Sequence, residues 1–260
     1  MKMKTSAVAW GLCVALWAAP GVGWAQIVNV QPLFTAEDHP GFAGQLEASA
    51  DWRTGNIRFL LVSGNASVRY RGGDNLLLAY VRGELGLQGG SQFVGRTFEH
   101  LRYRRRLVDW LQLEGFIQHD RDNFRRLALR MLAGAGPRVT FVQSKSWDLS
   151  MGVAYMAEYE LLRQGDFPDS GLELLNHRLS AYAVSSLKVN ELLRFGFTLY
   201  AQPRLDDPRD LRSLVELDLR VSITTHFGIK LTFSAAYDSQ PPAGLQPLDT
   251  ALKSSVQFGF

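Results

Sequence analysis

The stretch "VELDLRV" at residues 215–221 decides the fold class, because it alternates without a break between apolar and charged side chains. Apolar residues take the odd positions, and Glu216, Asp218 and Arg220 take the even ones. Successive side chains of a β-strand point to opposite faces, so a period of two predicts a strand with one apolar and one charged face. Whatever this strand belongs to must therefore cover one face with apolar material and the other with water or ionic partners.

The same alternation recurs along the chain, between turn-forming residues such as Gly72-Gly73-Asp74 and Gly89-Gly90. Further segments of this kind lie at 44–52, 111–118, 126–131, 149–160, 193–199 and 229–237. Every second connection is long and polar, namely 163–174, 203–210 and 239–248, whereas the intervening ones are short. About twelve strands of about ten residues, with short turns on one side and long loops on the other, predict a single antiparallel transmembrane β-barrel.

A periplasmic β-sandwich is the alternative, since it also alternates and also has regularly spaced turns. Sandwich strands should often be partly apolar on both faces. Here the second face carries Arg, Glu, Gln and Gly along whole strands. A lipid-facing exterior around a polar interior requires that arrangement, and closure leaves no unpaired strand edge in lipid. The sequence therefore favours the barrel.

The N-terminus has the features of a secretory signal peptide over residues 1–25. A basic "MKMK" precedes an apolar run at 7–19, and Gly23 and Ala25 supply small residues before the expected cleavage. The run is too short for a membrane-spanning helix, which takes about 20 residues. We expect residues 26–41 to form a periplasmic N-terminal segment and 42–260 the barrel. The only cysteine, Cys13, lies in the signal, which excludes a disulfide-stapled scaffold.

The last residues, "LKSSVQFGF" at 252–260, alternate like a strand and end in an aromatic residue. Val256, Phe258 and Phe260 share one parity, which suits the lipid face of the closing strand. They also resemble the insertion signal that the bacterial barrel-assembly machinery reads. The expected location is the outer membrane of a Gram-negative cell, with membrane lipid and the assembly machinery as partners.

Residues 98–138 carry a more specific resemblance. The pieces are "HLRYR" (100–104), "LEGFIQ" (113–118) and "RRLALRMLAGAGPR" (125–138), with "DWRTGN" (51–56) before them. These residues resemble the YdiY-type family of uncharacterised outer-membrane proteins, often labelled salt-induced. The resemblance implies an outer-membrane barrel and implies no reaction.

If the apolar residues face lipid, a set of charged side chains on consecutive strands faces the lumen. The candidate network comprises Arg102, Glu114, Arg126, Arg130 and Glu158. Arg126 and Arg130 share the polar face of one expected strand. Glu114 and Glu158 lie on the strands before and after it, so carboxylates are expected to flank these arginines on both sides. Such a network either fills and stiffens the barrel or forms a charged constriction for small ions or solutes. We therefore expect a structural barrel or a narrow passive pore.

The alternative function is a surface enzyme, either a lipid hydrolase or a protease, with a site at the extracellular rim. Its candidate residues are His119, Asp120 and Asp122 in "QHDRDN", although Asp and Asn also simply favour turns. No histidine lies beside a serine in a hydrolase motif, so we assign no catalytic residue. No metal-ligand spacing is present, and we expect no cofactor. Removing Lys2 and Lys4 with the signal leaves 26 basic against 25 acidic residues, which argues against nucleic acid as a partner.

Overall fold

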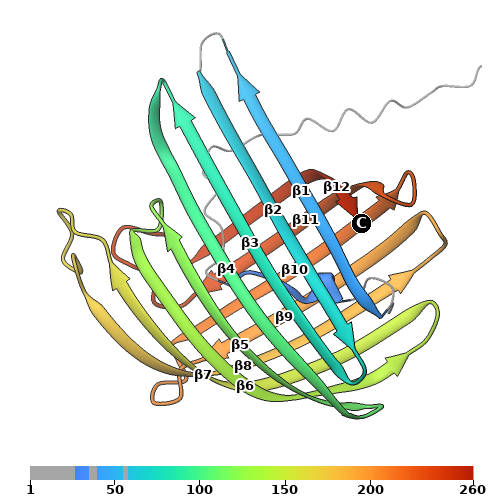
Figure 1. The fold of residues 1–260 in the computed structure, drawn as a ribbon. Helices are drawn as coiled ribbons and strands as arrows, with labels where there is room; N and C mark the ends of the chain where they lie inside the picture. Colours follow the sequence, from blue (N-terminus) through green and yellow to red (C-terminus); the bar gives the residue numbers. More distant parts are fainter. Residues whose placement is uncertain (1–26, 35–39, 55–57, 260) are drawn as a thin grey trace, which may run out of the picture.

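The computed structural model describes residues 27–34, 40–54 and 58–259, which form a closed ring of twelve antiparallel strands (Figure 1). The predicted barrel and its strand number are confirmed. The expected signal peptide and Phe260 lie outside the described residues. Among the described residues, no helix is both long and apolar enough to cross a membrane.

Each strand pairs with its neighbours in chain order, and β1 closes the ring against β12. The strands run from 11 residues in β9 to 18 in β4, longer than the ten or so expected. They are β1 (Gly41–Arg53), β2 (Phe59–Gly72), β3 (Asn75–Gln88), β4 (Ser91–Val108), β5 (Leu111–Asp122), β6 (Leu127–Gln143), β7 (Trp147–Leu162), β8 (Glu173–Lys188), β9 (Leu193–Pro203), β10 (Leu211–Ser222), β11 (Phe227–Asp238) and β12 (Leu248–Gly259).

The alternation of the sequence becomes the two faces of the wall. In β10, Leu217 is 48% exposed on the outside, whereas Asp218 is 8% exposed on the inside. Large apolar side chains on the outer face of the other strands are exposed in the same way, as Leu101, Met151 and Leu231 illustrate. This apolar exterior around a polar interior is the arrangement of a barrel whose outer surface meets lipid.

The two ends of the barrel differ in their connections. The loops at 163–172, 204–210 and 239–247 lie at one end, which we call the long-loop end. The opposite short-turn end carries brief connections such as 73–74 and 144–146. In bacterial outer-membrane barrels the long loops are extracellular and the short turns periplasmic.

The seam between β1 and β12 is the shortest ladder of the ring. It holds four residue pairs, from Gln45–Gly259 to Ala48–Val256, whereas β2 and β3 share fourteen. Val256 and Phe258 point outward at this seam, as their parity predicts.

Residues 27–34, which end in the short 3-10 helix η1 (Gln31–Phe34), lie inside the barrel rather than outside it in the periplasm as expected (Figure 1, dark blue). Two apolar patches on the inner wall explain this placement. Val30 and Phe34 pack against Leu76, Leu78, Tyr80 and Phe98 of β3 and β4. Ile27 packs on the other side of the lumen, in a cluster with Tyr182, Val184, Tyr200, Leu214 and Ala236 of β8 to β11. Burial of apolar side chains thus holds the segment across the lumen.

Candidate functional site in the barrel lumen

The long-loop half of the lumen holds a charged group centred on Glu158, a fully buried carboxylate of β7. Three guanidinium groups surround it. Arg130 of β6 donates from its Nε at 2.8 Å, Arg178 of β8 lies at 3.0 Å and Arg212 of β10 at 2.7 Å. Four strands that are not all neighbours are thereby joined through a single side chain.

Further carboxylates complete this group. Arg178 binds Asp210 at 3.0 Å, and Arg212 binds Glu160 at 3.0 Å and Asp238 at 3.2 Å. We call the seven residues the central cluster: Arg130, Arg178, Arg212, Glu158, Glu160, Asp210 and Asp238. Buried charges are tolerated when they are paired and hydrogen-bonded on several sides, and each arginine here meets a carboxylate.

A second group ties the N-terminal segment to the wall. Glu114 of β5 binds Arg102 at 3.1 Å and Arg104 at 3.0 Å, both from β4. Arg104 also donates to the Gln31 side chain at 2.6 Å, and its guanidinium lies 3.6 Å from the centre of the Phe34 ring. The segment is therefore held by polar and cation–π contacts as well as by apolar packing.

A third contact fixes the same segment to another part of the wall. Asn29 donates to Glu216 of β10 at 2.7 Å. Together with the Gln31 contact, this bond joins the segment to strands on both sides of the lumen. The segment consequently fills the space between them.

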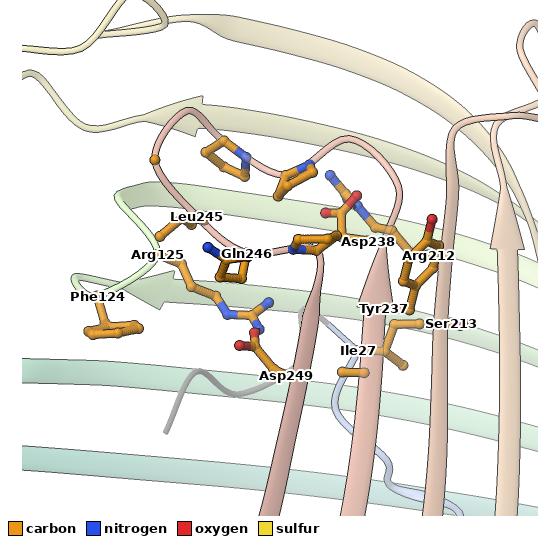
Figure 2. A pocket seen from close by; sticks show the side chains of 15 residues that line it. Ile27, Phe124, Arg125, Arg212, Ser213, Tyr237, Asp238, Leu245, Gln246 and Asp249 are labelled. Carbon is orange, nitrogen blue, oxygen red and sulfur yellow. Dashed lines mark hydrogen bonds and ion pairs between the residues drawn. The ribbon is translucent and has the colours of Figure 1, made fainter. Parts of the chain in front are cut away.

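A cavity of about 220 Å³ opens at the long-loop end, above the segment (Figure 2). Arg125 and Asp249 form an ion pair on its wall, and Ile27 also lines it. Burial, helped by the nearby charge of Arg96, lowers the pKa of the Arg125 guanidinium to about 10. The cavity is thus bounded by a charged pair and by the first described residue of the N-terminal segment.

The structure brings together two pairs of the predicted network and corrects the rest of it. Arg102 meets Glu114, and Arg130 meets Glu158. Arg126 does not share the inner face of β6, because that strand begins at Leu127 and Arg126 has a φ of 59°. It belongs instead to the β5–β6 turn and binds Asp169 at 2.7 Å.

The position of Glu114 also differs from the expectation that it would flank the arginines of β6. The register places Glu114 opposite Gly136, and Asp120 opposite Arg130. The side-chain period of two determines which face Glu114 occupies, but it leaves open where along the neighbouring strand it lies.

The candidate enzyme site at the rim is not formed. His119 points outward and contacts Glu99, whereas Asp120 is buried in the lumen near Arg96. Because the two side chains lie on opposite faces of β5, they do not converge on a substrate. No group of three or more potential metal ligands occurs among the described residues.

Residues that the sequence reading missed complete the central cluster. Arg178, Asp210, Arg212 and Asp238 lie at the long-loop ends of β8 to β11 or in the loop between β9 and β10. The inward parity of "NHRLS" (176–180) marks Arg178 as a lumen residue, since Asn176 and Ser180 are also buried. Asp210, in a loop, has no such periodic signal.

Comparison with known proteins gives the family of this chain. Residues 46–260 match a family described as "Protein of unknown function, DUF481". The chain belongs to this DUF481 family. The expectation of an uncharacterised family is confirmed. No curated protein matches the DUF481 chain.

Similar solved structures include the NanC porin, at 11% identity and a TM-score of 0.49, covering 84% of this chain and 97% of that one. The COG4313 outer membrane channel from Pseudomonas putida F1 has 10% identity and a TM-score of 0.49, with 85% and 95% coverage. The KdgM porin has 9% identity and a TM-score of 0.46, with 84% and 99% coverage. In architecture this DUF481 chain is a closed twelve-stranded antiparallel β-barrel with an apolar outer face and a polar lumen.

Proposed function

We propose that this protein is a narrow passive pore of the outer membrane for small ions or solutes, and that the structure represents its closed form. The observation that supports this proposal is the position of residues 27–34. Ile27 lines the cavity of about 220 Å³ at the long-loop end, and Phe34 lines a cavity of about 560 Å³ at the short-turn end. The segment therefore separates two spaces that together would cross the barrel.

The segment is better suited to open and close the lumen than the central cluster. The cluster consists mainly of side chains on wall strands, whose backbone is fixed by continuous ladders on both sides. Residues 27–34 belong to none of these ladders. Their attachment to the wall includes two apolar clusters and the side-chain contacts of Asn29, Gln31 and Phe34. Moving the segment breaks no strand pairing.

The test is the conductance of the refolded mature chain in planar bilayers. We expect rare openings for the mature chain and long, discrete open steps for a variant that lacks residues 26–34. Phe34→Ala, which removes the contact with Arg104, should open the pore more often than the mature chain does. Phe141→Ala is the matched control, since Phe141 is 59% exposed on the outer face. Silence of the deletion variant would reject the pore.

The location can be tested separately. Membrane fractionation should recover the mature protein with the outer membrane, and unheated samples should migrate differently from boiled ones on a gel. Phe258→Asp places a charge on the lipid face of the closing strand and should lower the amount of assembled barrel. Lys253→Ala should lower it much less, because Lys253 lies on the inner face, where its side chain donates to Ser63, and the change leaves the lipid face intact. Recovery as a soluble monomer would contradict the assignment.

A further inference from the structure

The lumen at the short-turn end is lined by cationic side chains. Two adjoining cavities of about 560 and 690 Å³ lie there and share Lys188, Asn190, Glu191 and Arg194 in their linings. Six of the lining cations, from five different strands, form what we call the cationic vestibule: Arg69, Arg71, Arg138, Lys188, Arg194 and Arg220. Asp148 and Glu191 are the carboxylates that line the same space. The wall therefore carries a clear excess of positive charge.

Two of these cations, Arg138 and Arg220, have no carboxylate partner among the described residues. Glu191 binds Lys188 at 2.8 Å, but its side chain is 86% exposed. Arg138 donates to two neutral groups, the side chains of Gln112 and Thr140, and its Nε is buried without a partner among the described residues. Arg220 has no carboxylate within ion-pair distance in the described part of the chain. At these two positions a guanidinium keeps its capacity to bind an anion.

The geometry favours a dissolved anion over a lipid headgroup. The neighbours of the vestibule cations, Val68, Leu187 and Phe195, are exposed on the outer face, so the cations themselves point into the lumen. A ligand must therefore reach them through the mouth of the barrel. Cations converging on a cavity with low-dielectric walls concentrate counter-ions, and planar guanidinium groups suit phosphate and carboxylate oxygens.

We propose that the cationic vestibule is a binding site for small multivalent anions that carry phosphate or carboxylate groups. Because the short turns of bacterial outer-membrane barrels face the periplasm, the vestibule opens on that side. Binding there does not require conduction. The further consequence, that the open pore prefers anions, rests on the proposed function. The end of the N-terminal segment borders this site, since Phe34 and Arg138 both line the cavity of about 560 Å³.

Isothermal titration of the refolded mature barrel in neutral detergent tests the binding, with inorganic pyrophosphate and citrate as probes and sucrose as the uncharged control. We expect both anions to bind, with affinity that falls as salt rises. Arg138→Gln and Arg220→Gln should each weaken pyrophosphate binding at least tenfold, whereas Arg163→Gln in a long loop should leave it unchanged. Lys188→Gln serves in place of either variant that fails to refold. Absence of binding, or equal loss in the Arg163 variant, would overturn the proposal.

Two further measurements separate this inference from its alternatives. In vesicles of anionic lipid, retained pyrophosphate binding supports a free-anion site, and its loss there but not in neutral vesicles would show that a lipid headgroup occupies the vestibule. In bilayers, the variant lacking 26–34 should show a reversal potential that indicates anion preference, reduced by Arg138→Gln. Silent bilayers together with intact pyrophosphate binding would reject the pore and retain the anion site. Conduction of the bilayers without pyrophosphate binding would reject the anion site and retain the pore.

Discussion

Arginine side chains have different surroundings in the central cluster and in the cationic vestibule. In the central cluster, Arg130, Arg178 and Arg212 surround Glu158 and meet further carboxylates. In the vestibule, Arg138 has only neutral partners. Charge in the long-loop half of the barrel is paired from wall to wall and contributes rigidity. At the short-turn end Arg138 keeps donor capacity for solutes, so the surroundings of an arginine along the barrel indicate whether it serves stability or binding.

The largest effect is expected from Glu158→Gln, which leaves three guanidinium groups without their shared carboxylate. Breaking a buried ion pair from one side costs about 3–5 kcal/mol. Glu191→Gln, at the exposed vestibule pair, should cost less than about 1 kcal/mol. Urea unfolding followed by tryptophan fluorescence measures both changes. Equal effects would remove the distinction between the two regions.

Arg130→Ala should come next, at about 3 kcal/mol, because it strands Glu158 and Glu160 only in part. Arg126→Ala provides a matched comparison in the adjacent turn. Its bond to Asp169 joins two loops and involves one carboxylate, so its loss should cost about 2 kcal/mol, less than that of Arg130. The thermal midpoints of the two refolded variants and of Arg163→Ala distinguish these positions. A larger loss for Arg126→Ala would contradict the strand boundary at Leu127.

The long loops should respond to acid through Asp169. Burial alone would raise its pKa, but the Ala243 N–H and the Arg126 guanidinium hold the pKa of this carboxyl below its ordinary value. A carboxyl whose pKa is lower in the folded state stabilises that state at pH values above its unfolded pKa, which is near 4. This contribution is lost as the pH falls through the folded pKa. Proteolysis within 163–172 should therefore quicken below about pH 4. Asp169→Asn should be cut readily at neutral pH, and Asp166→Asn should behave as the parent.

The smallest stability effect is expected at the vestibule itself. Arg138→Gln removes a cation that has like charges around it and no carboxylate bound to it. Its free energy of unfolding should change by less than about 0.5 kcal/mol, as at most surface positions. The same urea titration used for Glu158→Gln tests this, and a loss comparable to that of Glu158→Gln would place Arg138 in a structural network.

The alternation of apolar and polar residues alone predicts the barrel and the face that each side chain occupies, as Leu217 and Asp218 illustrate. It does not predict the register between strands, because sliding one strand by two residues along its neighbour leaves every side chain on the same face. For this reason the pairing of Glu158 with Arg130 is predicted correctly, whereas Glu114, expected beside the arginines of β6, binds Arg104 of β4. Arg126 fits the alternating pattern, yet its positive φ keeps it out of β6, which begins at the next residue, Leu127. The lumen segment "IVNVQPLF" (27–34) has no period, and its place follows only from apolar patches that the whole ring assembles.

The enclosed N-terminal segment also constrains the order in which the chain reaches its final form. Its binding surface is contributed by β3 and β4 on one side and β8 to β11 on the other, so it is incomplete until most of the ring exists. The seam between β1 and β12 joins opposite ends of the chain and is the most non-local pairing. Non-local contacts form late, because loop closure must precede them. The segment must therefore enter while the ring is still open, or thread lengthwise through the closed ring. A chain whose ring closes while its N-terminus is outside is kinetically trapped.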